Sequence, residues 1–261
     1  MTGTLLVAPH PDDEVLGASA ILCSGPVTVV HVTDGVPPWT EPSDRPRVRS
    51  TRRAECEAAW RSLAADVDCI SLGFGDLRAW QSVGDIARSL SQVAAAAAAG
   101  RVCLPAYQRG HPDHDATFLA GALAAESLTE QGIDWTIYGL YGLDAGRRLR
   151  FGWLPTERYA NQQHHEGAGL VAAKKVALRQ FASQLWPGSA LDRWLTDPGP
   201  EHFAPLPSDW QQIPDLPSFY DEQLGFARYG AGLATVEAAF HPILEPPGSS
   251  GSRRCPTTPR A

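Results

Sequence analysis

The feature that most constrains this chain is a regular alternation of short apolar runs with longer helix-like stretches over about its first 140 residues. The runs that predict strands, one of them almost entirely β-branched, are 4–8, 27–32, 69–72, 102–104 and 135–140. The stretches that predict helices are 14–23, 48–65, 83–99 and 114–128, with Gly100 expected to stop the third. Such an alternation is typical of parallel βαβ units, so we expect an α/β fold, a Rossmann-like, doubly wound and mostly parallel sheet.

The second half of the chain has a different pattern. A helix is predicted at 168–183, but 186–217 is rich in Pro, Trp, Asp and Gly and shows little periodicity. Segments of this kind usually cover a domain or shape the rim of a pocket. The predicted organisation is a core of residues 1–185, an irregular Trp/Pro-rich cover of the same domain at 186–245, and a disordered tail of linker composition at 246–261.

Composition excludes several classes of partner and compartment. The 22 basic and 29 acidic residues give a net charge of −7, so no basic field would hold nucleic acid. No apolar run approaches the ~18 residues of a membrane span, and the N-terminus lacks the basic start of a signal peptide. The five cysteines form no CxxC pair, which favours reduced thiols in the cytoplasm and argues against a cysteine zinc site. No pattern indicates an oligomeric state.

The first candidate site is the segment Ala8-Pro9-His10-Pro11-Asp12-Asp13-Glu14, which follows the first predicted strand. Ligands of open α/β sheets bind beyond the carboxyl ends of the strands. Three consecutive carboxylates repel one another there, and a divalent cation would remove that repulsion while gaining ligands. The alternative interpretation is that these carboxylates only cap and charge the first turn of a helix.

The second candidate site is Gly110-His111-Pro112-Asp113-His114, which follows the fourth predicted strand. The common doubly wound strand order 3-2-1-4-5 makes strands one and four neighbours, with a crevice at the switch point between them. Both loops would open onto that crevice. The two loops together therefore predict one shared metal site.

The available ligands are imidazoles and carboxylates without thiolates. Two His and one carboxylate suit a catalytic Zn²⁺ that keeps one position for water, so we expect one Zn²⁺ per chain. The same ligands suit the Fe²⁺ of non-haem oxygenases, although those enzymes generally have another, all-β scaffold, and another divalent ion is also compatible. Mg²⁺ would require more oxygen ligands.

The combination of HPDDE (10–14) with HPDH (111–114) resembles the PIG-L, or LmbE-like, family of zinc-dependent N-acetylglucosaminyl deacetylases. The resemblance covers about residues 4–185. It includes three weaker features, which are Thr33-Asp34-Gly35, the pair Arg52 and Glu55, and Ser183-Gln184.

The resemblance implies a role for each motif residue. The metal ligands would be His10, Asp13 and His114. Asp12 would be the general base that activates the attacking water. A protonated His111 would stabilise the oxyanion and then protonate the leaving amine, with Asp113 orienting it.

The resemblance also implies the reaction and its partner. We expect removal of an N-acyl group, most specifically N-acetyl, from a small or medium amino-sugar conjugate. An amidase of a larger sugar-conjugate amide and a non-catalytic metal- or sugar-binding module are the alternatives, and Asp12 argues against the second, because a binder needs no base. A nucleotide-binding module is disfavoured, because no GxGxxG follows the first strand.

Three further residues are candidates for substrate binding. Arg52 would clamp a sugar hydroxyl or instead pair with Glu55 along its helix. Arg109 would bind a hydroxyl or an anion, or instead lie in solvent. His164, in a polar loop, would line the pocket mouth or be merely exposed. The aromatic residues of the second half would either contact substrate or build their own core, among them Trp153, Trp186, Trp194 and Trp210.

Overall fold

The computed structural model describes residues 3–155, 158–159, 161–212, 216–219 and 226–244. The main sheet contains β1 (Gly3–Ala8), β2 (Val27–Thr33), β3 (Val67–Phe74), β4 (Ala99–Pro105), β5 (Asp134–Tyr138), β8 (Gln163–His165) and β9 (Glu201–Pro205). A separate hairpin pairs β6 (Tyr141–Leu143) with β7 (Leu149–Phe151). The α-helices are α1 (Asp13–Leu22), α2 (Arg45–Ser62), α3 (Val83–Ala96), α4 (Pro112–Ser127), α5 (Ala168–Leu178), α6 (Ala190–Thr196) and α7 (Leu233–Leu244). Short 3₁₀ turns are η1 (Ala79–Gln81), η2 (Thr129–Gln131), η3 (Ala182–Gln184) and η4 (Phe226–Tyr229).

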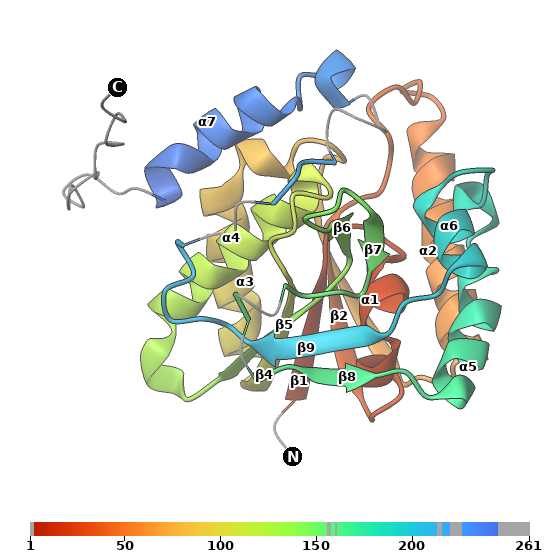
Figure 1. Cartoon of the computed structure of the whole chain (residues 1–261), viewed down its shortest axis with the longest axis horizontal. Coiled ribbons are helices and arrows are strands. Elements are labelled where there is room, and N and C mark those ends of the chain that lie inside the picture. Colours follow the sequence, from red (N-terminus) through yellow and green to blue (C-terminus); the bar gives the residue numbers. More distant parts are fainter. Residues whose placement is uncertain (1–2, 156–157, 160, 213–215, 220–225, 245–261) are drawn as a thin grey trace, which may run out of the picture.

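The strand order of the main sheet is β3-β2-β1-β4-β5-β9-β8 (Figure 1). The first five strands are parallel, in the predicted order, whereas β9 pairs antiparallel with β5 and with β8. This confirms the predicted α/β class with a mostly parallel sheet. The central strands are apolar on both faces because helices cover both sides of a doubly wound sheet.

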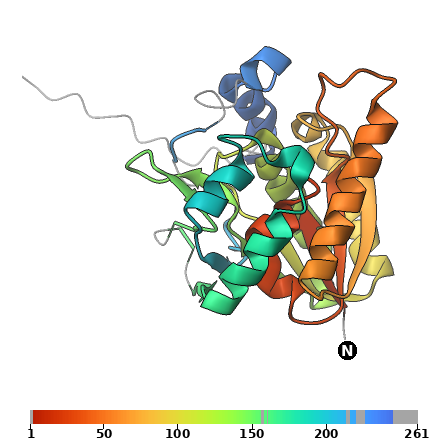
Figure 2. The ribbon, with the colours of Figure 1, turned by 90° about the vertical axis from the view of Figure 1, so that its right-hand side faces the viewer.

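Alternate residues of β1 pack into two separate cores. Leu5 and Val7 join the core beneath α3, α4 and α7, and Leu6 joins the core beneath α1, α2, α5 and α6. Successive side chains of a strand point to opposite faces, so each strand supplies both layers. Figures 1 and 2 show the two helical layers, with α2 and α5 packed side by side in the second.

The predicted end of the third helix, and the role of Gly100 in stopping it, are wrong. The helix with the alanine run ends at Ala96 instead of at Gly100, and the left-handed residue is Ala98 with φ 46°. Gly100 lies inside β4, because pairing of β4 with β1 begins at Ala99. Long-range strand pairing here overrides local helix propensity.

The cover at 186–245 is not irregular as predicted. It contributes α6, α7 and the sheet strand β9, whose Phe203 and Ala204 are buried. β9 supplies the hydrogen-bonding partner that the edge of β5 would otherwise lack, a long-range requirement that local periodicity does not reveal. The predicted helix at 168–183 ends at Leu178 and resumes only as η3. The predicted tail at 246–261 lies outside the described residues.

The fold brings two loops together at the carboxyl edge of the sheet. The loop from β1 to α1 and the loop from β4 to α4 leave neighbouring parallel strands at the same edge (Figure 1). Among the described helices, none has the length and apolar character needed to cross a bilayer.

Candidate metal centre

The two predicted loops meet in one buried cluster of imidazoles. The ring centroids of His10 and His111 are 4.6 Å apart, those of His10 and His114 are 5.3 Å apart, and those of His111 and His114 are 4.8 Å apart. One nitrogen from each ring lies within 4.8 Å of the others. The convergence follows from the adjacency of β1 and β4, which places both loops over one crevice.

Local backbone interactions aim these side chains. His111 occupies the N-cap of α4, and its Nδ1 accepts a hydrogen bond of 3.1 Å from the Asp113 amide. His114 stands one helical turn further, so its ring stacks on that of His111. Gly110 precedes the cap because a Cβ there would lie 2.0 Å from the Tyr141 carbonyl oxygen.

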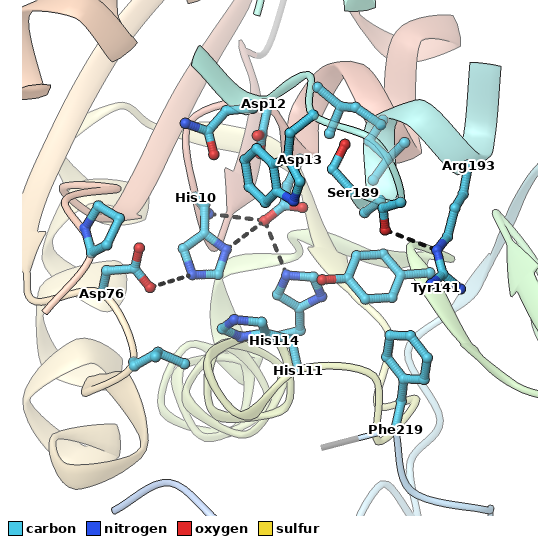
Figure 3. Close-up of a pocket in the computed structure, with 18 of the residues that line it drawn as sticks. His10, Asp12, Asp13, Asp76, His111, His114, Tyr141, Ser189, Arg193 and Phe219 are labelled. Carbon is cyan, nitrogen blue, oxygen red and sulfur yellow. Dashed lines mark hydrogen bonds and ion pairs between the residues drawn. The ribbon is translucent and has the colours of Figure 1, made fainter. Parts of the chain in front are cut away.

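Asp13 completes a cradle with two of the imidazoles (Figure 3). Its Oδ2 lies 3.0 Å from His10 Nδ1 and 3.2 Å from His114 Nε2. Despite that proximity, both ring nitrogens of the buried His114 make no hydrogen bond with any described residue. Orphaned buried nitrogens are costly, and convergence with a carboxylate is the arrangement that a cation satisfies. The residues therefore fit a divalent metal ion.

A carboxylate behind His10 orients its ring. Asp113 Oδ2 lies 3.0 Å from His10 Nε2, and the Asp113 carboxylate also accepts from the amides of Leu77 and Ala79. His10 Nε2 therefore donates to Asp113, while Nδ1 faces Asp13 Oδ2 at 3.0 Å and is the ring nitrogen directed into the cradle. A carboxylate–histidine pair of this kind orients metal-binding imidazoles.

This arrangement differs from the role expected of Asp113. The resemblance implies that its carboxylate orients His111, but that carboxylate lies on His10 instead. His111 is oriented by the Asp113 main-chain amide, because its ring is the acceptor at the start of α4.

The charges of the cradle are strongly coupled. Burial raises the pKa of Asp13, but the nearby His114 and His10 outweigh burial and hold that pKa well below its usual range. Burial lowers the pKa of His10, but hydrogen bonds to Asp113, Asp13 and Asp76 raise it overall. Opposite charges here stabilise one another out of solvent.

Asp12 lies beside the cradle and belongs to a different electrostatic environment. Its side chain makes no capping hydrogen bond, so the alternative interpretation of Asp12 as a simple N-cap is not supported. Burial raises its pKa to about 7, against the lowering effect of Arg52 and with the repulsion of Asp13. A carboxylate titrating near neutral pH suits general-base chemistry.

Arg52 holds the Asp12 carboxylate. It is buried within the pocket wall and donates Nη2–H to Asp12 Oδ2 at 3.2 Å and to the Pro11 carbonyl. The expected alternative, a pair with Glu55, is wrong, because Glu55 instead accepts from the amide and hydroxyl of Ser183. The fold turns this helix face inward because α2 packs against α5 and η3.

The surroundings of His111 favour its neutral form, whereas the resemblance implies a ring that is protonated during the reaction. Burial, His10 and His114 all lower its pKa well below the ordinary value. Because Nδ1 is the acceptor for the Asp113 amide, the ring proton resides on Nε2. His111 can therefore donate one hydrogen bond into the pocket but holds no second acidic proton.

Glu14 is a site residue to which the sequence assigned no separate role. Its fully buried carboxylate accepts from the Asp12 amide at 3.1 Å, from Trp60 Nε1 at 3.0 Å and from His31 Nε2 at 3.2 Å. Asp12 has φ 133°, a strained value for a residue other than Gly. The Glu14 carboxylate restrains this strained backbone.

Asp76 and Tyr141 are two further residues of the site that the sequence analysis does not identify. Asp76 lies on the pocket wall, with Oδ1 3.5 Å from His10 Nε2. Its position just after the third predicted strand, at the carboxyl edge, was a usable signal. Tyr141 places its ring 5.0 Å from that of His114, and this contact depends on the hairpin β6–β7, which the sequence did not predict.

The site opens into a cavity of about 540 Å³. Arg52 lines this cavity together with the His–Asp cluster. The structure does not bring the other two substrate-binding candidates to it. Arg109, with φ 51°, donates to the Leu216 carbonyl and to Glu237, which ties its loop to α7. His164 is exposed on β8, with Nε2 3.9 Å from Glu166 Oε1.

Comparison with known proteins confirms the resemblance in fold and sequence. The PIG-L family, described as GlcNAc-PI de-N-acetylase, matches residues 5–125, which contain both loops. The A40926 pseudoaglycone deacetylase Dbv21 is 25% identical over 78% of this chain and 96% of its own, with a TM-score of 0.58. A zinc-inhibited form of teicoplanin deacetylase Orf2 is 18% identical over 78% and 97%, with a TM-score of 0.56.

A third similar structure is that of another sugar deacetylase. The N,N'-diacetylchitobiose deacetylase from Pyrococcus horikoshii is 20% identical over 74% of this chain and 73% of its own, with a TM-score of 0.52. No curated protein sequence matches this chain.

Proposed function

We propose that this chain, which resembles the PIG-L family in residues 5–125 and LmbE-like deacetylases in fold, removes an N-acyl group, most specifically N-acetyl, from an amino-sugar conjugate. The observation that carries the proposal is the meeting of His10, Asp13 and His114 with the Arg52-held carboxylate of Asp12 in one cavity. The products would be acetate and a free amine.

Three residues would hold the metal, namely His10, Asp13 and His114. Bound there, Zn²⁺ would polarise the amide carbonyl and make water more acidic. Fe²⁺ or another divalent ion remains an alternative that the same ligands allow. Asp113 and Asp76 support the cradle through His10.

Asp12 would perform both proton transfers. As a buried carboxylate with a pKa near 7, it can accept the proton of the attacking water. When the tetrahedral intermediate collapses, the same carboxyl can return that proton to the departing amine. Arg52 holds Asp12 in place and favours its charged form before the reaction.

His111 would stabilise the developing oxyanion as a neutral donor. Its Nε2–H is the only proton that the ring offers while Nδ1 accepts from the Asp113 amide. Preorganised donors of this kind typically contribute a factor of ~10²–10³ to kcat. Protonation of the amine is assigned to Asp12, because a neutral imidazole is a poor acid.

The substrate class follows from the chemistry of the similar enzymes. Those structures are deacetylases of the A40926 pseudoaglycone, of teicoplanin and of N,N'-diacetylchitobiose. We extend this to a small or medium sugar conjugate for the present chain, acting in the cytoplasm. A binding protein without activity is disfavoured, because binding alone does not require a strained Asp12 backbone or an ion pair between Arg52 and Asp12.

The test compares Asp12→Asn with the parent protein, each loaded with zinc, on methyl and aryl glycosides of N-acetylglucosamine. We expect kcat for amine release to fall by a factor of about 10²–10⁴ while bound zinc stays at one per chain. Asp85→Asn is the matched control, because Asp85 is an exposed residue of α3 that pairs with Arg88. Chelation should abolish parent activity and Zn²⁺ should restore it.

Acetate must appear in equal amount to the amine, which separates a deacetylase from an amidase of a larger acyl group. Full activity of Asp12→Asn, or parent activity that survives complete metal removal, would contradict the mechanism.

A further inference from the structure

The rim of the cavity carries two tryptophans that are more than half exposed. Trp39 has 58% of its surface exposed and Trp186 has 53%. Among the described residues, the other large hydrophobic side chains with marked exposure are Ile70 and Val176, neither of which lines the cavity. Exposed apolar surface is thus concentrated where the site opens, and such concentrations mark binding surfaces.

The two tryptophans come from separate parts of the chain. Trp39 belongs to the loop between β2 and α2, and Trp186 follows η3 just before α6. Local sequence gives neither loop a reason to expose an indole. Both loops nevertheless place that indole on the wall of the same cavity.

Polar and apolar side chains both line the cavity. Its buried part contains the histidines and aspartates of the metal cradle (Figure 3). Leu149, Pro187 and Leu191 line the cavity along with the tryptophans, next to the polar side chains of Gln184, Ser189 and Arg193. A ligand that contacts both the cradle and the indoles would carry a polar amide and, at a distance from it, an apolar surface.

The volume of the cavity also exceeds the needs of one sugar. At about 540 Å³ it falls within the ~300–1,000 Å³ that hold drug-sized ligands. A single N-acetylated ring bound at the metal cradle would fill only part of this volume and leave the indoles in water. Indoles gain most from flat aromatic or extended apolar surfaces, against which they stack.

We propose that the mouth of this cavity is a specificity site in which Trp39 and Trp186 bind the aromatic aglycone of the amino-sugar conjugate. This inference rests on the proposed function and names the class of conjugate that it acts on. The indoles are half in solvent, so the group on them remains partly outside, as a bulky rigid aglycone would. A flexible acyl chain gains stability chiefly by complete burial, which the open rim does not offer.

The first experiment measures KM and kcat for zinc-loaded protein on methyl and naphthyl glycosides of N-acetylglucosamine. The naphthyl glycoside should have a KM roughly tenfold lower, with kcat similar for both, because stacking acts on binding. Trp39→Ala and Trp186→Ala should each raise the naphthyl KM several-fold and raise the methyl KM far less. Trp186→Phe should retain part of the preference.

Val176→Ala is the matched control, because Val176 is an exposed apolar residue of α5 outside the cavity. Equal KM values for the two glycosides would overturn the proposal. So would tryptophan variants that lower kcat equally on both glycosides, since that result indicates a structural role. The proposal would also be overturned if the tryptophan variants lost the parent protein's binding to neutral lipid vesicles while their KM values for both glycosides stayed unchanged. That result would assign the indoles to membrane binding.

A second measurement does not depend on turnover. Calorimetry with the naphthyl glycoside of glucosamine, which has no amide to cleave, reports binding at the mouth directly. Binding that is several-fold weaker in Trp39→Ala and Trp186→Ala supports the specificity site even if no glycoside is hydrolysed. Binding that is absent, or equal in all variants, refutes the site even if deacetylation is observed.

Discussion

Three consecutive carboxylates occupy three different environments. Asp13 faces two imidazoles, which lower its pKa, whereas Asp12 is buried with a pKa of about 7. Glu14 points away from the cavity toward Trp60 and His31. The different environments thus suit Asp13 to bind a metal, Asp12 to act as a base and Glu14 to hold the Asp12 backbone, although the three residues are consecutive and two of them are aspartates.

The substitution Glu14→Gln tests whether the Glu14 carboxylate restrains the Asp12 backbone. An amide cannot accept hydrogen bonds from Asp12, Trp60 and His31 at once, because one of its ends is itself a donor. We expect kcat to fall by about 10²-fold, as for a misplaced catalytic group, while zinc content and KM stay close to the parent values. Trp60→Phe, which removes one donor without placing a donor on Glu14, should have a smaller effect on kcat. Unchanged kcat in Glu14→Gln would show that the Asp12 backbone needs no such restraint.

At the scale of elements, α1 is broken at Ala18, which has φ −143°. Gly17 lies against Tyr138, where a Cβ would come within 2.6 Å of the ring. The amides of Ser19 and Ala20 donate instead to the carboxylate of Glu201 on β9. The break therefore joins the helix that begins at the metal cradle to the antiparallel edge of the sheet.

A buried lysine on α5 neutralises that carboxylate. Lys174 Nζ lies 2.7 Å from Glu201 Oε1 and 4.7 Å from the centre of the Trp194 ring, and burial lowers the pKa of the lysine. We expect Lys174→Met to lower the free energy of unfolding by about 3–5 kcal/mol, because it leaves a buried charge uncompensated. Denaturant titration measures the loss.

Lys175→Met is the control for this prediction, because Lys175 is the less buried neighbour on the same helix. Adding Glu201→Gln to Lys174→Met should recover part of the stability. Equal stability of the Lys174 and Lys175 variants would contradict a structural role for the buried pair.

The stability of the whole molecule should depend on the protonation of His31. Burial lowers the pKa of His31, but Glu14 and Cys69 raise it to about 9, above the ordinary 6.5. Because the folded pKa is the higher one, the stabilisation is fully present below pH 6.5 and is lost as pH rises through 9. A rise of the pKa from 6.5 to about 9 corresponds to at most roughly 3.5 kcal/mol of stabilisation.

Urea titrations at pH 6 and pH 9.5 measure this loss. The parent protein should lose more stability between the two pH values than His31→Gln does. His164→Gln, which changes an exposed histidine, should behave like the parent. The same pH dependence in all three proteins would rule out His31 as the source.

The sequence by itself determined the strand order and, through it, the meeting of the HPDDE and HPDH loops. Periodicity and strand ends are local properties, and the rules of doubly wound sheets convert them into neighbours. The candidate ligands and Asp12 could therefore be named before the structure was known, together with the metal class that their chemistry suits.

Only the tertiary structure decided which group each side chain contacts. In the structure the Asp113 carboxylate contacts His10 and not His111, and Arg52 contacts Asp12. Arg109 contacts Glu237 of α7, and β9 belongs to the main sheet. The tertiary structure also sets two distant indoles on one rim. A hydrogen bond requires a donor–acceptor distance that is correct to within fractions of an ångström. The packing of elements far apart in the chain sets the positions of donor and acceptor, and no local pattern encodes that packing.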